Sequence, residues 1–274
     1  MDESEKEYFG RLTSLASAYQ ANKCELAKSR VMMFASSLTR QIEKDKTYDL
    51  IVAAGNSGLF MMKLAKMTYD ALGKNLPDYI VLPIIRFSDE SETTLYDNSS
   101  LLPYIPTELP KHLNMLFVDD EIMRGITLKH SIDLIILQNP KIMHIDCTVI
   151  AENHFFEWHY DMPQVSIQFF AYARLIHGLN GNIGHFVPED MFENIKKKIP
   201  GVTSYNHAMA IVTGNGFKRT NDQGIPYFDT DVTSICSKHI PEYHQKEKLL
   251  VNELNDLVEK GIEGYKNGTI TFRF

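Results

Sequence analysis

The segment from Asn114 to Thr127 constrains the fold more than any other part of the chain. It begins with an apolar run of strand length that ends in two adjacent carboxylates, Asp119 and Asp120. A short loop containing Gly125 follows, and an apolar helical pattern begins at Thr127. This order predicts a buried strand, a turn and a helix. It places both carboxylates at the carboxyl end of a strand, where open α/β sheets bind their ligands.

Strands and helices are predicted to alternate on both sides of this segment. Apolar runs predict the strands, and apolar residues at helical spacing predict the helices. The strands are Tyr48 to Ala54, Tyr79 to Arg86, Met115 to Asp119, Met143 to Ala151 and Val165 to Tyr172; the helices are Gly58 to Leu72, ended by Gly73, and about Thr127 to Gln138. Such alternation is typical of an α/β protein with a mostly parallel sheet flanked by helices.

Helices are also predicted at both ends of the chain. Amphipathic patterns cover residues 4–22 and 25–44. The C-terminal part carries a helix near 189–198, an apolar run from Ala208 to Val212, a loop rich in Gly, Asn and Asp at 213–231, and a helix from about 241 to 260. We expect N-terminal helices packed on the core at 1–44, the core at 45–185, and an extension at 186–274 that forms a hood or an oligomer interface. We also expect a homo-oligomer.

Charge and cysteine content narrow the class of protein. The formal net charge of -7 disfavours a nucleic-acid or anionic-membrane binder and favours small-molecule ligands. The 3 cysteines are widely spaced and do not form a disulfide framework. The acidic first residues lack the apolar core of a signal peptide, and no apolar run reaches the roughly 18 residues of a membrane span. We therefore expect a cytoplasmic protein that binds neither nucleic acid nor membranes.

A second strand-to-helix turn supports the same interpretation as the first. The predicted strand that ends at Ala54 runs into the small residues Gly55, Asn56, Ser57 and Gly58, which open a helix. Backbone amides in such a turn can approach a phosphate closely, and the helix N-terminus favours negative charge. Taken alone, the turn fits a phosphate site and a plain tight turn equally well.

The connection between the two turns is unusually long. Residues 87–113 are rich in Ser, Thr, Asp and Glu, and they contain Pro103, Pro106 and Pro110. Long connections in compact domains are often active-site lids, so this segment is a candidate lid.

Together these features resemble the type I phosphoribosyltransferases. The family's signature is four apolar residues, two acidic residues and a short loop containing Thr and Gly, and it binds 5-phosphoribosyl-1-diphosphate. The corresponding residues here are Leu116, Phe117 and Val118, followed by Asp119 to Thr127. The family also has an earlier pyrophosphate loop, matched by Ala54 to Gly58, and a mobile loop between the two, matched in position by residues 87–113.

The resemblance implies a Mg²⁺-dependent enzyme that transfers ribose 5-phosphate to a nitrogenous base and releases pyrophosphate. Asp119 and Asp120 would hold the ribose hydroxyls and face the metal ion. The 5-phosphate would lie against Glu121, Ile122, Met123, Arg124, Gly125, Ile126 and Thr127; the pyrophosphate would lie against Ala54, Gly55, Asn56, Ser57, Gly58 and Arg86.

The sequence departs from the family at several positions. Many members carry Thr or another small residue where this chain has Met123 and Arg124, although an inward-pointing Arg124 could bind phosphate in a bidentate way. Enzymes acting on 6-oxopurines have Asp at the position of Met123. The candidate lid has one basic residue at each end, Arg86 and Lys111, and none between. These departures leave the acceptor base undetermined. The alternative is a non-catalytic protein of the same fold that senses the sugar phosphate or a nucleotide and acts through a partner.

Some single motifs also fit other interpretations. Val118 to Glu121 also resembles the start of a response-regulator receiver, but Asp161 does not end an apolar strand and a receiver would leave the Gly55 turn unexplained. A polar-aromatic patch at 152–159 and a group of Cys236, His239 and His244 match no standard zinc spacing. Aromatic residues near 169–172 and the Gly-containing segment 174–185 could border the base.

Overall fold

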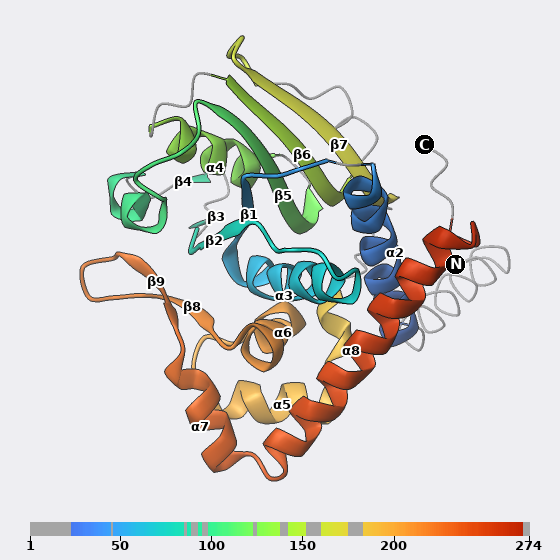
Figure 1. The fold of residues 1–274 in the computed structure, drawn as a ribbon. Helices are drawn as coiled ribbons and strands as arrows, with labels where there is room; N and C mark the ends of the chain where they lie inside the picture. The colour runs from blue at the N-terminus through green and yellow to red at the C-terminus, as the bar shows by residue number, and fades with distance from the viewer. Residues whose placement is uncertain are drawn as a thin grey trace, which may run out of the picture.

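The computed structural model describes residues 23–44, 46–84, 87–88, 93–94, 98–122, 125–137, 142–151, 160–174 and 183–270 (Figure 1). The helix predicted over residues 4–22 lies outside these residues. None of the helices in the described ranges has the length and apolar character that a membrane span requires.

A five-stranded sheet forms the centre of the fold. Its strands are β1 (Leu50–Ala54), β2 (Asp78–Leu82), β5 (His112–Ile122), β6 (Ile142–Ala151) and β7 (Val165–Arg174). Their order is β2-β1-β5-β6-β7, and every neighbouring pair is parallel. The predicted α/β class with a parallel sheet is therefore confirmed. All five residues of β1 are buried, as expected for a strand covered on both faces.

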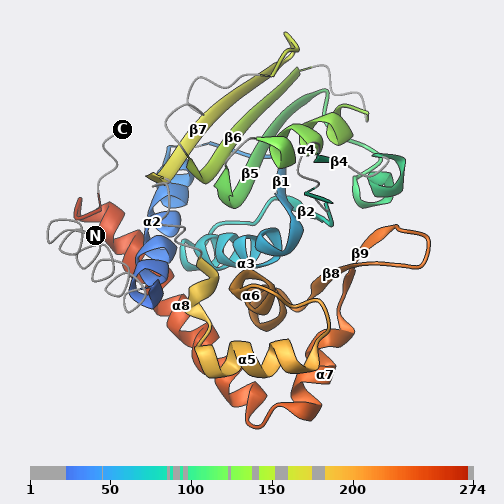
Figure 2. The same ribbon diagram turned by 180° about the vertical axis from the view of Figure 1, so that it is seen from behind.

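Alternating side chains of the central strands feed two separate cores. On one face Ile51, Ala53, Leu116 and Val118 pack with α2 (Lys23–Glu43) and α3 (Gly55–Ala71). On the other face Leu50, Val52, Met115 and Phe117 pack with α4 (Ile126–Ile136) and the 3₁₀ helix η1 (Asn98–Tyr104). This period of two follows from strand geometry. Figures 1 and 2 show α3 and α4 on opposite faces of the sheet.

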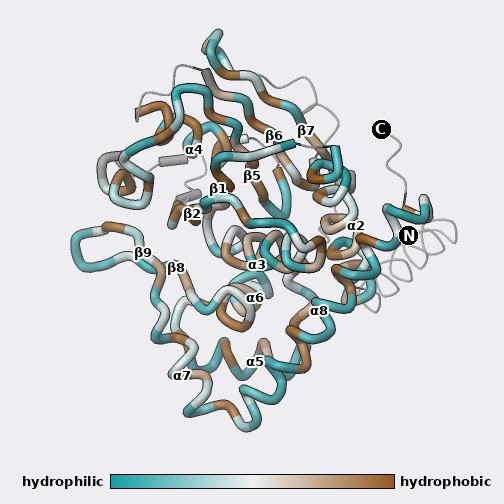
Figure 3. Tube along the Cα trace, in the orientation of Figure 1, coloured by the Kyte–Doolittle hydropathy of each residue, from teal (hydrophilic) through white to brown (hydrophobic). Residues whose placement is uncertain are grey.

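The C-terminal part joins the core on the α3 side. It comprises η3 (Ile183–Phe186), α5 (Glu189–Lys198), α6 (Tyr205–Gly214), β8 (Phe217–Thr220), β9 (Pro226–Asp229), α7 (Asp231–His239) and α8 (Tyr243–Lys266). Its buried residues belong to the same hydrophobic cluster as those of α2 and α3. Along α8, hydrophobic and hydrophilic residues alternate in Figure 3, as expected for a helix with one buried face.

Three sequence predictions need correction. The expected loop at 213–231 contains the antiparallel hairpin β8–β9, whose short strands carry few apolar residues to mark them. The helix expected over about 241–260 is preceded by a separate helix, α7, and runs on to Lys266. The helix expected from Gly58 begins at Gly55, since Gly55 adopts a left-handed φ of 69° that turns the chain directly out of β1.

The candidate lid is partly described. It contains a small antiparallel pair, β3 (Phe87–Ser88) with β4 (Thr93–Thr94), and then η1. The hydroxyl of Tyr104 in η1 donates a hydrogen bond to the carbonyl of Pro226 in β9, at 3.4 Å. The 3₁₀ helix η1 within this segment therefore contacts the C-terminal hairpin.

Close packing of α8 on α2 gives the first prediction. A Cβ at Gly261 would lie 2.4 Å from the carbonyl oxygen of Met32, so we expect Gly261→Ala to lower the free energy of unfolding by about 1 to 3 kcal/mol despite the better helix propensity of Ala. Gly264→Ala is the matched control, because its Cβ would meet the movable end of the Ile270 side chain. Urea unfolding measures both variants. Equal stabilities would contradict the packing described here.

Candidate functional site

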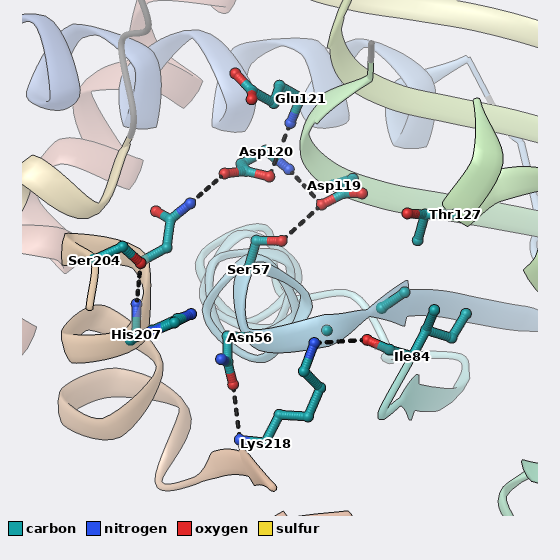
Figure 4. A pocket seen from close by; sticks show the side chains of 13 residues that line it. Asn56, Ser57, Ile84, Asp119, Asp120, Glu121, Thr127, Ser204, His207 and Lys218 are labelled. Carbon is teal, nitrogen blue, oxygen red and sulfur yellow. Dashed lines mark hydrogen bonds between the residues drawn. The ribbon is translucent and has the colours of Figure 1, made fainter. Parts of the chain in front are cut away.

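A cavity of about 290 Å³ opens at the carboxyl edge of the sheet, where β1 and β5 end side by side (Figure 4). It is lined by Ala54, Gly55, Asn56, Ser57, Ile84, Asp119, Asp120, Glu121, Thr127, Ser204, Asn206, His207 and Lys218. The two turns singled out in the sequence thus border the same space. Its place matches the general location of ligand sites in parallel sheets.

The turn after β1 presents the start of α3 to the cavity. The left-handed φ of Gly55 would strain any other residue, and α3 begins at Gly55 itself. The first turn of α3 has no acidic residue, and Ala54 offers no side chain that could cap the free N–H groups. This helix N-terminus therefore suits an anion.

A β-bulge brings the two carboxylates together. The register between β5 and β6 runs from Val118 opposite Thr148 to Glu121 opposite Ile150, so β5 contains one extra residue at Asp119–Asp120. In a regular strand these neighbours would face opposite sides of the sheet, and a bulge re-aims side chains. Both carboxylates border the cavity, and their residues are only 6% and 7% exposed.

Hydrogen bonds from one side chain and two backbone N–H groups hold the carboxylates in place. Ser57 Oγ donates to Asp119 Oδ1 at 3.0 Å, and the backbone N–H of Asp120 donates to the same oxygen at 2.9 Å. The backbone N–H of Glu121 donates to Asp120 Oδ1 at 3.0 Å. Burial raises the pKa of Asp119 well above its usual range, and the neighbouring Asp120 raises it further; the donors oppose this only in part. A cation or hydrogen-bond donors from a ligand would favour the ionised form.

The far wall of the cavity comes from the C-terminal part. Asn206 Nδ2 donates to Asp120 Oδ2 at 2.8 Å. The backbone N–H of Lys218 donates to Asn56 Oδ1, and Lys218 Nζ donates to the carbonyl of Ile84, each at 2.8 Å. Figure 4 shows Lys218 reaching from the hairpin across the start of α3. The cavity therefore has an acidic side at β5 and a cationic side at α3 and β8.

His207 borders the same space in its neutral form. Burial lowers its pKa, and the charge of Lys218 lowers it further, so the ring is uncharged at neutral pH. Its Nδ1 accepts a hydrogen bond from the backbone N–H of Thr203 at 3.2 Å. The ring also meets Phe217 edge-on, with centroids 5.2 Å apart. His207 is thus a polar, uncharged part of the wall.

Sequence reasoning missed the residues of this far wall. One local signal was present: Ser204 precedes the apolar run at 208–212 and caps α6, its Oγ accepting from the backbone N–H of His207 at 3.4 Å. That pattern predicts a helix N-terminus but not its position against β5. Nothing around Lys218 marks it as a site residue.

Not every predicted residue borders the cavity. Gly58 lies in α3 against β1, where a Cβ would approach the backbone of Ala53 to 3.0 Å, so it serves helix–strand packing. Ile122 is buried in the core on the α4 side. Gly125 has a left-handed φ of 67° and precedes α4, whose first residue is Ile126. Met123, Arg124 and Arg86 lie outside the described residues, as does the patch at 152–159.

A metal site built by the protein alone is not found in the described ranges, which contain no group of three or more His, Cys, Asp or Glu side chains able to hold an ion. Cys236 is buried, whereas His239 and His244 are exposed. The adjacent pair Asp119 and Asp120 offers carboxylate oxygens at the cavity, and Glu121 also borders it.

Comparison with known proteins gives matches to solved structures only. No family model and no curated protein matches the chain. A hypothetical protein from Neisseria gonorrhoeae with bound ppGpp is 15% identical, with a TM-score of 0.35, over 53% of this chain and 78% of that one. A hypoxanthine phosphoribosyltransferase from Staphylococcus aureus is 15% identical, with a TM-score of 0.34, over 51% of this chain and 73% of that one. A purine phosphoribosyltransferase from Pyrococcus horikoshii is 18% identical, with a TM-score of 0.32, over 51% of this chain and 86% of that one. Likenesses this distant add nothing to the geometry described above.

The buried carboxyl of Asp119 gives the second prediction. Because its pKa is raised on folding, the folded protein binds more protons than the unfolded chain once the pH exceeds about 4, and stability falls as pH rises toward the folded pKa. We expect Asp119→Asn to raise the free energy of unfolding by about 1 to 3 kcal/mol near pH 8 and by less near pH 5. Urea unfolding at both pH values measures the difference.

The control for this experiment is Asp256→Asn on the exposed face of α8. It should leave the stability difference between the two pH values unchanged. A gain for Asp119→Asn that is the same at both pH values, or a loss at both, would show that the carboxyl is not held in an unfavourable environment.

Proposed function

We propose that this protein binds 5-phosphoribosyl-1-diphosphate with Mg²⁺ in the cavity and transfers the 5-phosphoribosyl group to a nitrogenous base, releasing pyrophosphate. One observation carries the proposal: the Gly55 turn and the Asp119–Asp120 pair border a single cavity at the ends of adjacent parallel strands. A doubly phosphorylated pentose needs hydroxyl acceptors and two anion sites, and the carboxylates and the starts of α3 and α4 all border this cavity.

The sugar would lie against the β5 side. Carboxylate oxygens of Asp119 and Asp120 can accept hydrogen bonds from two neighbouring hydroxyls, and such charge-assisted bonds are among the stronger ones in proteins. The 5-phosphate would lie at the start of α4, where Thr127 borders the cavity and the N-terminal dipole favours negative charge. In that position the phosphate would lie next to the helix N-terminus and not directly against the carboxylates of Asp119 and Asp120.

The pyrophosphate would lie at the start of α3. The candidate lid has no basic residue between Arg86 and Lys111, and Lys218 supplies a cation from the hairpin instead. Asn56 borders the same end of the cavity and is 6% exposed. The first turn of α3 has no acidic residue. Together with the lysine, this helix N-terminus would stabilise the negative charge of the departing pyrophosphate.

Asp119 and Asp120 also suit Mg²⁺, since this ion is usually held by one or two carboxylates together with substrate phosphates and water. When bound, it would neutralise charge on the pyrophosphate. The protein's own residues would orient the sugar, hold the leaving group and keep water away from the anomeric carbon, where positive charge develops during ribosyl transfer.

A binding protein without catalytic activity is the second candidate. One observation favours it: Lys218 Nζ donates to the carbonyl of Ile84 and so links the hairpin to the residues after β2. A lysine with this structural role need not take part in catalysis. Such a protein would bind the sugar phosphate and report it through a partner.

The third prediction separates these functions. Calorimetry with 5-phosphoribosyl-1-diphosphate and Mg²⁺ should show binding, and a screen of purine and pyrimidine bases should find one that triggers pyrophosphate release. Asp119→Asn combined with Asp120→Asn should weaken binding at least about 100-fold with an unchanged circular dichroism spectrum. Asp256→Asn with Glu259→Gln removes two exposed charges from α8 and should bind normally.

Binding without turnover on any base would favour the sensor. The absence of binding would eliminate both functions, and full affinity in the double Asn variant would eliminate the site.

The fourth prediction concerns the cation. Lys218→Met removes the ammonium group and leaves the backbone bond to Asn56 in place. Affinity for inorganic pyrophosphate should fall about tenfold, while that for ribose 5-phosphate stays within about twofold. Lys260→Met on the exposed face of α8 is the matched control. Equal losses for both ligands would refute a specific role at the pyrophosphate end.

A further inference from the structure

The side chain of Asn206 connects the acidic pair to the C-terminal part of the chain. Its Nδ2 donates to Asp120 Oδ2 at 2.8 Å, and its Oδ1 accepts from the backbone N–H of Gly184 at 3.2 Å. A carboxylate can only accept and a backbone N–H can only donate, so these two bonds fix which way the amide points. Neither Asp nor Leu at this position could make both bonds with Asp120 ionised.

Backbone packing holds Asn206 in place. A Cβ at Gly184 would lie 2.5 Å from the backbone N of Asn206 and 2.6 Å from the carbonyl carbon of Tyr205, so η3 rests directly on the first turn of α6. Ser204 caps the same turn. The amide group that donates to Asp120 is therefore held in position before a ligand binds. Such preorganisation strengthens the hydrogen bonds of a binding site.

The two carboxylates are oriented from different parts of the chain. Ser57 on α3 holds Asp119, and Asn206 on α6 holds Asp120. Asp120 Oδ1 accepts from the backbone N–H of Glu121 and Asp120 Oδ2 accepts from Asn206, and a carboxylate oxygen can accept more than one bond. A hydroxyl can therefore bind Asp120 without displacing either donor.

We propose that Asn206 is a positioning residue that aims Asp120 at a ribose hydroxyl, so that the C-terminal part completes the sugar site. This inference rests on the proposed function. It also assigns to the segment from η3 to α6 a role in ligand selection, beyond packing on α3.

The test, our fifth prediction, compares two probes that differ only in the hydroxyls. Ribose 5-phosphate carries the 2- and 3-hydroxyls of the ring, and 2,3-dideoxyribose 5-phosphate carries neither of these two. Calorimetry with Mg²⁺ should show that the wild type prefers ribose 5-phosphate by at least about tenfold. Asn206→Leu should lose most of this preference through weaker binding of ribose 5-phosphate, with affinity for the dideoxy compound within about threefold of wild type.

A purely structural role would lower affinity for both probes equally and leave the preference intact, which would overturn the inference. Asn194→Leu is the control, because it removes an amide hydrogen bond of the same 2.8 Å length in α5, away from the cavity. If Asn206→Leu does not fold, Asn206→Ala removes the same donor without added bulk or charge, and the same criterion applies.

The outcomes also separate the two proposals. Wild-type protein that binds neither probe overturns the proposed function and the inference together. Wild-type preference that persists in the Asn206 variants overturns the inference alone.

Discussion

The backbone hydrogen bonds between β1 and β5 determine where the two turns of the site lie. They pair Leu50 with Met115 and Ala53 with Val118 in parallel, so both strands end at the same edge of the sheet. Gly55, directly after β1, and Asp119, near the end of β5, must then meet across one cavity. A shift of this register by one residue would exchange the apolar side chains of β5 between the two cores, where their sizes would no longer match their neighbours.

Burial of two adjacent carboxylates is the main energetic cost of this arrangement. Removing charged groups from water is unfavourable unless hydrogen bonds compensate, and the raised pKa of Asp119 shows that compensation is incomplete. The bulge places both groups in the cavity, and donors from three separate elements hold them. A fold selected only for stability would not keep such a pair. Perturbed groups of this kind concentrate at functional sites.

Local patterns predicted the parts of the structure that depend on local chemistry. The central strands, α3, α4 and the approximate place of α5 follow from apolar periodicity, and the two turns follow from Gly residues and acidic residues beside strand ends. The far wall could not be predicted, because Asn206 and Lys218 reach the cavity through contacts with residues more than 80 positions away. The hairpin β8–β9 was missed for a related reason: its strands are short and mostly polar, and are stabilised by contacts with α3 and η1. The expected homo-oligomer and cellular location stay predictions.

The most direct test of the account is a crystal structure of the protein with ribose 5-phosphate and Mg²⁺. We predict two ring hydroxyls within about 3 Å of carboxylate oxygens of Asp119 and Asp120, and the phosphate at the start of α4 beside Thr127. A sugar phosphate bound with its hydroxyls turned away from both carboxylates, or in another part of the molecule, would contradict the central claim that this edge of the sheet recognises a phosphorylated pentose.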